Sequence, residues 1–342
     1  KKIYMNTIII AEAGVNHNGD IEYAKRLIEC AADAKADYVK FQTFVAAKII
    51  DAKAKKANYQ IENSKDKVET QLQMVQKLEL SKEDHEVLIE HCEANNIGFL
   101  STAFDSESVD LLESFGQRIF KIPSGEITNF PLIRQIARIP GKKIISTGMS
   151  TMEEIKQAIE VLEKAGTTRS DMIVLHCNTQ YPTPMEDVNL RAMNTIKEEC
   201  NVAIGYSDHT LGIEVPIAAV AMGAQLIEKH FTLDRRMVGP DHAASLEPKE
   251  LKAMVQSIRN IEQAIGDGVK RVSPSEKENI KIARKSVFYN QSLTSGDVIT
   301  IEHLVMKRPG DGISPSKIDE IVGKIVTSDV HKEAYFKWSD VS

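Results

Sequence analysis

The sequence predicts an α/β fold, a (β/α)8 TIM barrel, followed by a small β-rich domain at the C-terminus. Short apolar runs typical of buried parallel strands alternate with amphipathic stretches typical of helices. Eight such strand and helix units over some 260 residues match the arrangement of this barrel. After residue 283 the pattern changes to short apolar pieces separated by turn-forming residues, which predicts the second domain.

The expected strands of the barrel are apolar runs that become polar near their carboxyl ends. They lie at 7–14, 37–44, 98–104, 118–125, 142–149, 171–178, 202–209 and 224–231. Helices are expected between them, among others at 20–34, 82–95, 106–115, 151–165 and 190–199. Four of these helices have candidate N-cap residues, which are Asp20, Ser81, Ser106 and Ser150.

An insertion interrupts the regular spacing between the second and third expected strands. Residues 45–80 are rich in lysine at first and amphipathic later. After a barrel strand, such an insertion lies on the active-site face and often acts as a lid or a dimer contact. A solvated surface loop without a role is the alternative, and the sequence does not separate the two.

The chain divides into three parts. Residues 1–266 form the expected barrel, and the polar segment 267–283, with its glycines and proline, is expected to be a linker. Residues 284–342 form the expected β-rich domain. At roughly 60 residues this domain is close to the lower limit of independent stability, so we expect it to lean on the barrel or on a second subunit.

Composition excludes several classes of protein. The 342 residues carry 43 Lys and Arg against 49 Asp and Glu, and this net charge of −6 offers no attraction for nucleic acid or an anionic membrane. No stretch reaches the roughly 20 apolar residues of a membrane span, and the apolar start of the chain is expected to be a strand, not a signal peptide. The 4 cysteines form no CxxC pair, which is typical of reduced thiols in a cytoplasmic protein.

Polar residues stand at the carboxyl ends of all eight expected strands. In strand order they are Glu12; Lys40 and Gln42; Ser101 and Thr102; Lys121, Ser124 and Glu126; Ser146 and Thr147; His176 and Asn178; Ser207, Asp208 and His209; and Glu228 and His230. A barrel places its active site at this face, whereas a purely structural core uses branched apolar residues. The sequence therefore predicts a functional site here.

Two lysines, Lys40 and Lys121, converge on this face from the second and fourth strands. Hydroxyl groups accompany them, from Thr102, Ser124, Ser146 and Ser207. Compact positive charges with directional donors suit a phosphate or a carboxylate, so we expect an anion site. The alternative for either lysine is an internal salt bridge, with Glu12, Glu126 or Glu228 as its partner.

His209 and His230 end neighbouring strands and can approach one metal ion. With two histidines and no nearby cysteine, an octahedral ion that keeps several waters is favoured over a closed zinc site. Imidazole nitrogen makes Mn²⁺ the first choice and Mg²⁺ the second. Proton transfer has four candidates that the sequence does not rank, namely Glu12, Glu126, Glu228 and Asp241.

Ten ordered motifs carry a resemblance to a known family. They are EAGVNHNG (12–19), KFQTF (40–44), LSTAFD (100–105), KIPSGE (121–126), STGM (146–149), HCNTQYPTP (176–184), GYSDHTLG (205–212), EKHFTLD (228–234), GPDHAASLEP (239–248) and KRPGDGIS (307–314). Over essentially its whole length the chain resembles the sialic acid synthases, which include N-acetylneuraminate and legionaminic acid synthases. Its C-terminal part is similar to their antifreeze-like (SAF) domain.

The resemblance implies a reaction. Phosphoenolpyruvate condenses with N-acetylmannosamine, or a related 2-acetamido sugar, and water to give N-acetylneuraminate and phosphate. The alternative member of the family is N,N'-diacetyllegionaminate synthase, which uses 2,4-diacetamido-2,4,6-trideoxymannose. The family is homodimeric, with the small domain over the partner's barrel, so Arg308 is expected to reach the neighbouring site.

The resemblance also implies roles for residues of this chain. Phosphoenolpyruvate would be bound by Lys40, Gln42, Thr102, Lys121, Ser124, Ser146 and Ser207. Catalysis would fall to Glu12, Glu126 and Lys121. The sugar would contact Asn178, Tyr181, Asp241 and Arg308. His209 and His230 would hold the divalent metal.

Two other classes remain open at the level of the sequence. A metal-dependent aldolase or lyase would handle pyruvate through a barrel lysine or the metal. A carbohydrate- or ice-binding protein without activity is suggested by the C-terminal domain. The eight polar strand ends argue against the second class, since a surface binder does not need them.

Overall fold

The computed structural model describes residues 6–54 and 70–342. It divides into two compact units, Lys1–Gly266 and Asp267–Ser342. Among the described residues, none of the helices combines the length and the apolar character that crossing a membrane requires. The four cysteines carry free thiols.

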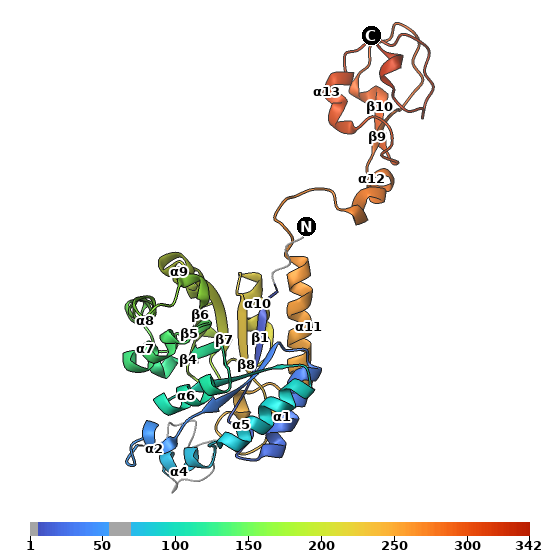
Figure 1. Cartoon of the computed structure of the whole chain (residues 1–342). Coiled ribbons are helices and arrows are strands. Elements are labelled where there is room, and N and C mark those ends of the chain that lie inside the picture. Colours follow the sequence, from blue (N-terminus) through green and yellow to red (C-terminus); the bar gives the residue numbers. More distant parts are fainter. Residues whose placement is uncertain (1–5, 55–69) are drawn as a thin grey trace. The chain divides into compact units, whose positions relative to one another are not determined.

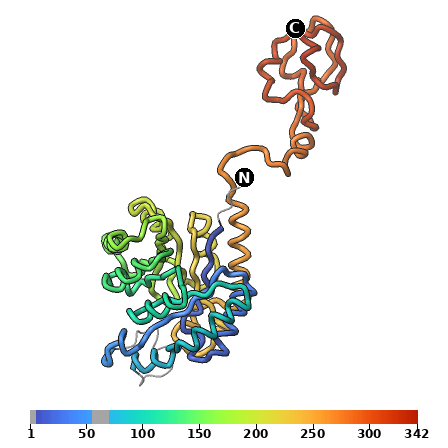
Figure 2. Tube along the Cα trace, viewed as in Figure 1, coloured from blue at the N-terminus to red at the C-terminus, as the bar shows by residue number. Residues whose placement is uncertain are grey.

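The first unit is built on eight parallel strands (Figure 1). They are β1 (Ile8–Gly14), β2 (Tyr38–Thr43), β3 (Gly98–Ala103), β4 (Ile119–Ile122), β5 (Lys142–Ser146), β6 (Met172–Cys177), β7 (Ala203–Asp208) and β8 (Leu226–His230). Their order is β3-β2-β1-β8-β7-β6-β5-β4, so β1 pairs with both β2 and β8, and Figure 2 shows the blue β1 beside the yellow β8. β3 and β4, at the two ends of this order, also contact each other, which confirms the predicted TIM-like barrel.

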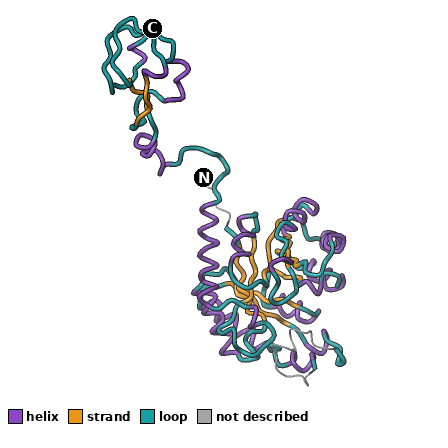
Figure 3. Tube along the Cα trace, turned by 180° about the vertical axis from the view of Figure 1, so that it is seen from behind, coloured by secondary structure: helices purple, strands orange, loops and turns teal. Residues whose placement is uncertain are grey.

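Helices surround these strands, as the purple and orange segments of Figure 3 show. They are α1 (Ile21–Asp33), α2 (Ala46–Ile49), α4 (Gln71–Gln76), α5 (Lys82–Ala94), α6 (Ser106–Ser114), α7 (Phe130–Arg138), α8 (Met152–Lys164), α9 (Ala192–Cys200), α10 (Glu214–Ala221) and α11 (Pro248–Ala264). The main core lies between strands and helices. A separate cluster of branched residues, including Ile10, Ile144 and Leu175, fills the barrel interior below the site.

Most expected elements of the barrel are confirmed within a few residues, and the differences have local causes. The prediction of Ser106 and Ser150 as caps was wrong. The side chain of Asp105 caps α6 by accepting from the Ser108 N–H at 2.9 Å. Thr151 caps α8 in a reciprocal pair with Glu154. In both helices two adjacent residues can cap, and a shift of one position decides which does.

The insertion between β2 and β3 contributes two short helices, α2 and α4, within its described part. Most of the lysine-rich stretch named above falls at 55–69, outside the described residues. On either side of it, apolar side chains form a small cluster of their own around Val15, Phe44 and Leu78. This cluster lies at the carboxyl ends of β1 and β2.

The second unit has an antiparallel pair of strands, β9 (Ser286–Tyr289) and β10 (Leu304–Lys307). Two short helices, α12 (Lys277–Ala283) and α13 (Ile318–Ile321), complete its regular structure, and α12 lies within the segment expected to be a linker. The unit has its own hydrophobic core, which includes Val287, Tyr289 and Phe336. This small antiparallel unit confirms the predicted β-rich C-terminal domain.

Candidate active site

A cavity of about 610 Å³ opens at the carboxyl ends of the barrel strands. Nine of the residues predicted for the site line it, namely Glu12, Gln42, Lys121, Ser124, Ser146, Tyr181, Ser207, His209 and His230. Strand register brings them to one level, since Glu12 of β1 pairs with Lys40 of β2 on one side and with His230 of β8 on the other. Side chains from strands far apart in the sequence therefore meet at one mouth.

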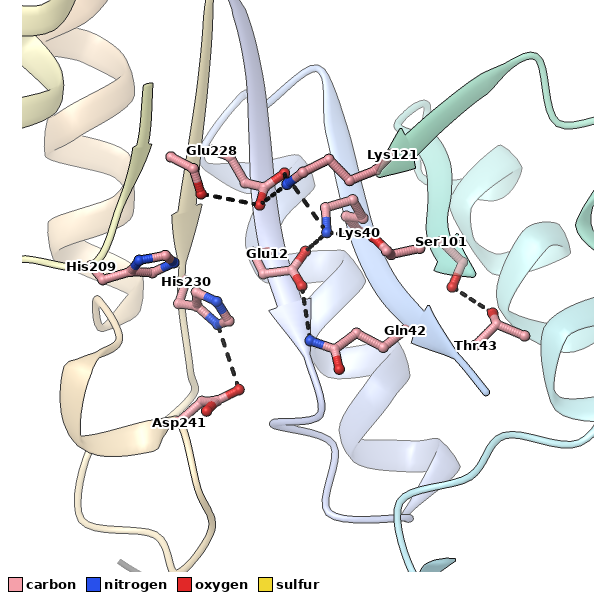
Figure 4. Close-up of polar contacts among 12 residues, drawn as sticks. Glu12, Lys40, Gln42, Thr43, Ser101, Lys121, His209, Glu228, His230 and Asp241 are labelled. Atoms are coloured by element: carbon pink, nitrogen blue, oxygen red, sulfur yellow. Dashed lines mark hydrogen bonds and ion pairs between the residues drawn. The ribbon is translucent and has the colours of Figure 1, made fainter. Parts of the chain in front are cut away.

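The two lysines converge as predicted, and two buried carboxylates neutralise them (Figure 4). Lys121 Nζ donates to both oxygens of Glu228, at 2.7 and 2.9 Å. Lys40 Nζ lies 2.7 Å from Glu12 Oε2 and 3.7 Å from Glu228 Oε2. The salt-bridge alternative for the lysines is thus the arrangement that the structure shows, with Glu12 and Glu228 as partners.

Glu228, one of the four carboxylates that the sequence offered for proton transfer, lies at the centre of the site although the resemblance assigned it no role. Its carboxylate is 4% exposed and touches both lysines, and the Ser207 hydroxyl donates to it at 3.3 Å. The signal was its position at the end of the eighth strand, two residues before His230. Residue types alone did not separate a proton carrier from a counter-ion of the lysines.

Burial and neighbouring charges shift the pKa values of Glu12 and Glu228 in opposite directions. Burial raises the pKa of Glu12 above its usual range, against the opposing charge of Lys40. Burial also favours the neutral form of Glu228, but the charges of Lys121 and Lys40 outweigh it and hold the pKa of Glu228 below its usual value. Glu12 is therefore the carboxylate that can carry a proton near neutral pH, and Glu228 is the permanent anion.

The hydroxyl groups around the lysines fall into two kinds. Thr102 is engaged, since it accepts a hydrogen bond from Lys40 Nζ at 2.8 Å, and the Ser124 hydroxyl accepts one from the Gly148 N–H at 3.0 Å. Ser146 is 3% exposed, and its hydroxyl has no hydrogen-bond partner among the described residues. A buried hydroxyl that faces a cavity without a partner fits a site built for a polar ligand.

The histidine pair lies on the β7–β8 side of the mouth, with ring centroids 5.4 Å apart. His209 Nδ1 donates to the Asn178 carbonyl, which leaves Nε2 as the acceptor for the Tyr181 hydroxyl at 2.8 Å. Burial lowers the pKa of His209 to about 4, and burial together with His209 lowers that of His230 well below its usual value. Both imidazoles are neutral, as metal ligands must be.

Of the four residues predicted to contact the sugar, some lie at the mouth of the barrel and others lie outside the cavity lining. Tyr181 stacks on His209 with centroids 4.0 Å apart. Asp241 is 8% exposed, and its carboxylate lies 3.9 Å from His230 Nδ1. The side chain of Asn178 is outside the cavity lining and accepts from the Gln180 N–H at 2.7 Å. Arg308 belongs to the second unit, where its Nε donates to the Ala283 carbonyl.

Glu126 also stands apart from the other predicted residues of the site. It lies in the turn after β4, and its carboxylate accepts from Asn129 Nδ2 at 2.6 Å. It does not line the main cavity. Its role in proton transfer therefore stays a prediction that the geometry favours less than that of Glu12.

A buried ion pair behind the histidines holds the two strands that carry them. Lys229 Nζ contacts the Asp208 carboxylate and the Thr210 carbonyl at 2.5 Å each, and both charged side chains are fully buried. These residues alternate with His209 and His230 along the strands and so point to the opposite face. The pair ties together the backbones on which the imidazoles sit.

Comparisons with known proteins show the family of the chain. The family model described as the NeuB family matches residues 27–270, and that of the SAF domain matches residues 284–342. The chain is similar to the N,N'-diacetyllegionaminic acid synthase of Campylobacter jejuni, with 53% identity over 96% of this chain and 98% of the relative. Identity to the synthase of the same name from Legionella pneumophila is 45%, over 98% of this chain and 95% of that protein.

A solved structure gives the same result at the level of coordinates. The crystal structure of the N-acetylneuraminic acid synthetase of Leptospira borgpetersenii matches with a TM-score of 0.70 and 38% identity, covering 81% of this chain and 91% of that chain. Family model, relatives and solved structure thus point to one group of carbohydrate-biosynthetic enzymes. The chain belongs to the NeuB family of sialic and legionaminic acid synthases and carries a C-terminal SAF domain.

Proposed function

We propose that this enzyme condenses phosphoenolpyruvate with 2,4-diacetamido-2,4,6-trideoxymannose and water to give N,N'-diacetyllegionaminate and phosphate. The family resemblance favoured N-acetylneuraminate as the product, with N,N'-diacetyllegionaminate as the alternative. The order is reversed because the relatives at 53% and 45% identity are both N,N'-diacetyllegionaminic acid synthases. The human N-acetylneuraminate-9-phosphate synthase is 34% identical. The observation within the site that carries the reaction type is the pair of buried lysines at the same mouth as the Ser146 hydroxyl, which has no hydrogen-bond partner within residues 6–54 and 70–342.

Phosphoenolpyruvate is proposed to bind where the lysines and hydroxyls meet. Lys40, Lys121 and Ser146 supply two charges and an available donor for its phosphate and carboxylate. Two lysines face two carboxylates in this cluster, so their charges balance when Glu12 is ionised. An entering anion adds negative charge, which favours a proton on Glu12, the carboxylate whose pKa burial already raises. Substrate binding thus prepares Glu12 as a general acid.

A divalent metal fits the histidine pair. Within residues 6–54 and 70–342, no group of three or more His, Cys, Asp or Glu side chains is arranged to hold a metal ion. The protein would supply two neutral imidazoles, and water and the sugar oxygen would fill the other positions, which suits Mn²⁺ and, as a second choice, Mg²⁺. Such an ion polarises the aldehyde of the open-chain sugar.

The chain's own residues then perform the remaining work. Carbon 3 of phosphoenolpyruvate attacks carbon 1 of the sugar, and the aldehyde oxygen gains a proton, for which Glu12 is the proposed donor. Water adds to carbon 2 of the former phosphoenolpyruvate and gives up a proton, for which the Glu12 carboxylate is the proposed acceptor. The tetrahedral adduct then loses phosphate as the carbon 2 hydroxyl becomes a ketone and passes its proton to the departing phosphate. Lys40 and Lys121 hold the charge of the departing phosphate throughout.

The aldolase alternative is disfavoured by the same ion pairs. A Schiff base needs a neutral amine, whereas burial of Lys40 is outweighed by Glu12 and Glu228, which raise its pKa above the usual value. Lys121 is held by Glu228 at 2.7 Å. Borohydride in the presence of pyruvate should therefore leave both lysines unmodified.

The choice of sugar is tested by comparing two substrates. We expect kcat/KM for 2,4-diacetamido-2,4,6-trideoxymannose to exceed that for N-acetylmannosamine by more than about a hundredfold, the scale set by lost polar partners. The measurement is phosphate release from phosphoenolpyruvate with each sugar and Mn²⁺. Equal values, or a preference for N-acetylmannosamine, would return N-acetylneuraminate to first place.

We further propose that the enzyme acts as a homodimer in which Arg308 binds the N-acetyl group in the partner's site. Arg308 is exposed in the second unit and follows the strand β10. An exposed guanidinium is free to meet a substrate on another protomer.

Replacing Arg308 tests this role. Arg308→Ala is expected to raise KM for the sugar roughly 10- to 100-fold, the scale of a hydrogen bond to a charged group, and to leave KM for phosphoenolpyruvate unchanged. Lys307→Ala is the matched control, because Lys307 is a neighbouring cation that pairs with Glu333 at 2.9 Å. Wild-type sugar kinetics in Arg308→Ala would remove Arg308 from the site.

A further inference from the structure

A second, smaller cavity of about 210 Å³ adjoins the catalytic one. The two share three lining residues, Gln42, Tyr181 and His230. Asp241, beside His230, lines the second cavity only. A substrate that reacts at the histidine pair can therefore extend one of its groups into this second cavity.

The second cavity differs from the first in its chemistry. Apart from these polar residues its walls are apolar, and most of them come from the ends of β2 and β3 and from the short helices α2 and α4, among them Phe44, Phe104, Ile49 and Val75. Phe44 and Phe104 meet edge to face with ring centroids 6.2 Å apart. The larger cavity is lined mainly by hydroxyl, charged, amide and imidazole groups, with Met149 and Cys177 among its other residues. Apolar walls attract carbon surface and offer no partner to a hydroxyl.

The open-chain sugar has one end that matches such a wall. Its carbon 1 reacts, so carbon 1 lies at the histidine pair, and the substituent on carbon 2 stays beside it in the larger cavity. Carbon 6 is the end furthest from the reaction. In a 6-deoxy sugar this end is a methyl group, and in N-acetylmannosamine it carries a hydroxyl.

We propose that this smaller cavity, the methyl subsite, receives the carbon-6 end of the substrate and selects a 6-deoxy sugar. The inference rests on the proposed function and adds the residues that set its specificity. Asp241 lies on the polar side of the methyl subsite, where its carboxylate can accept a hydrogen bond from an amide N–H on carbon 4. The methyl subsite thus combines an apolar end wall with a carboxylate acceptor on its polar side, and both features match the 2,4-diacetamido-6-deoxy pattern.

The test uses two sugars that differ only at carbon 6, namely 2,4-diacetamido-2,4,6-trideoxymannose and its 6-hydroxy counterpart. The wild-type enzyme is expected to favour the deoxy sugar in kcat/KM by about 10- to 100-fold, since an apolar pocket rejects an added hydroxyl only to that extent. Val75→Thr replaces a methyl of the wall by a hydroxyl and is expected to lower this ratio at least fivefold. Ile49→Thr, on the other helix of the wall, should lower it as well.

Val87→Thr is the matched control, because Val87 lies on α5 and is 38% exposed outside both cavities. Its ratio should equal that of the wild type. KM for phosphoenolpyruvate should be unchanged in every variant, and an unchanged value indicates that the barrel is folded. A wild-type ratio near one overturns the methyl subsite, and so does an unchanged ratio in Val75→Thr and Ile49→Thr with normal KM for phosphoenolpyruvate. Failure of the proposed function is a separate result, in which neither diacetamido sugar reacts faster than N-acetylmannosamine.

Discussion

Glu228→Gln is expected to lower the Tm of the ligand-free enzyme by roughly 10 °C. Glu228 is almost fully buried and holds Lys121 at 2.7 Å and Lys40 at 3.7 Å. Removing one partner of a buried ion pair leaves an uncompensated charge, which costs about 3–5 kcal/mol. In a domain of this size each kcal/mol corresponds to about 2–4 °C in Tm. The measurement is thermal unfolding followed by circular dichroism.

Phosphoenolpyruvate should restore much of the lost stability. Its negative groups would replace the missing charge of Glu228 beside the lysines, so saturating ligand is expected to raise the Tm of Glu228→Gln by more than it raises that of the wild type. Glu199→Gln is the control, because Glu199 pairs with Lys156 at 2.7 Å on the surface, and it should shift Tm by about 1 °C or less. Equal Tm values for Glu228→Gln and the wild type would show that Glu228 does not compensate the lysines.

The pH dependence gives an independent check on the same residue. The folded-state pKa of Glu228 lies below its unfolded value of about 4.3, so its ionised form stabilises the fold above that pH. This contribution is lost as the pH falls through the lowered folded-state pKa. The Tm difference between wild type and Glu228→Gln should therefore be full at neutral pH and shrink in acid.

The barrel and most of its mouth could be predicted because local pattern determines them. Apolar runs define the strands, and a parallel barrel brings all carboxyl ends to one face, so Lys40, Lys121, His209 and His230 follow from their positions alone. The helix α10 was not predicted, because its sequence EVPIAAVA is apolar almost throughout and has no amphipathic period. Whether a lysine pairs with Glu228 or is left for a bound substrate anion depends on distances across the barrel. The sequence does not contain these distances.

The methyl subsite was beyond sequence analysis for a related reason. Phe44, Ile49, Val75 and Phe104 each have the apolar character of ordinary core residues. Their common wall exists only because α2 and α4 fold against the ends of β2 and β3. A cavity forms where side chains leave space unfilled. Whether they do depends on how segments far apart in the chain pack together.

Loss of the histidine pair is expected to have the largest effect on catalysis. His209→Ala combined with His230→Ala should lower kcat by at least about a thousandfold, because stabilisation of a developing negative charge is worth about 10²- to 10³-fold for a single donor. Excess chelator should abolish turnover by the wild type, and added Mn²⁺ should restore it. The double variant should stay inactive with Mn²⁺ present.

The same variants separate the metal site from the anion site. The imidazoles lie on the β7–β8 side of the mouth, whereas Lys40 and Lys121 come from β2 and β4. Stabilisation by phosphoenolpyruvate should therefore survive in the double histidine variant, measured as a rise in Tm. His91→Ala removes a partly exposed histidine of α5 that pairs with Glu29 and should keep full activity. Full turnover in excess chelator, or by the double variant, would contradict a metal at His209 and His230. The aldehyde would then have to be activated by protein donors alone, of which the Tyr181 hydroxyl, 2.8 Å from His209 Nε2, is the one best placed at this side of the mouth.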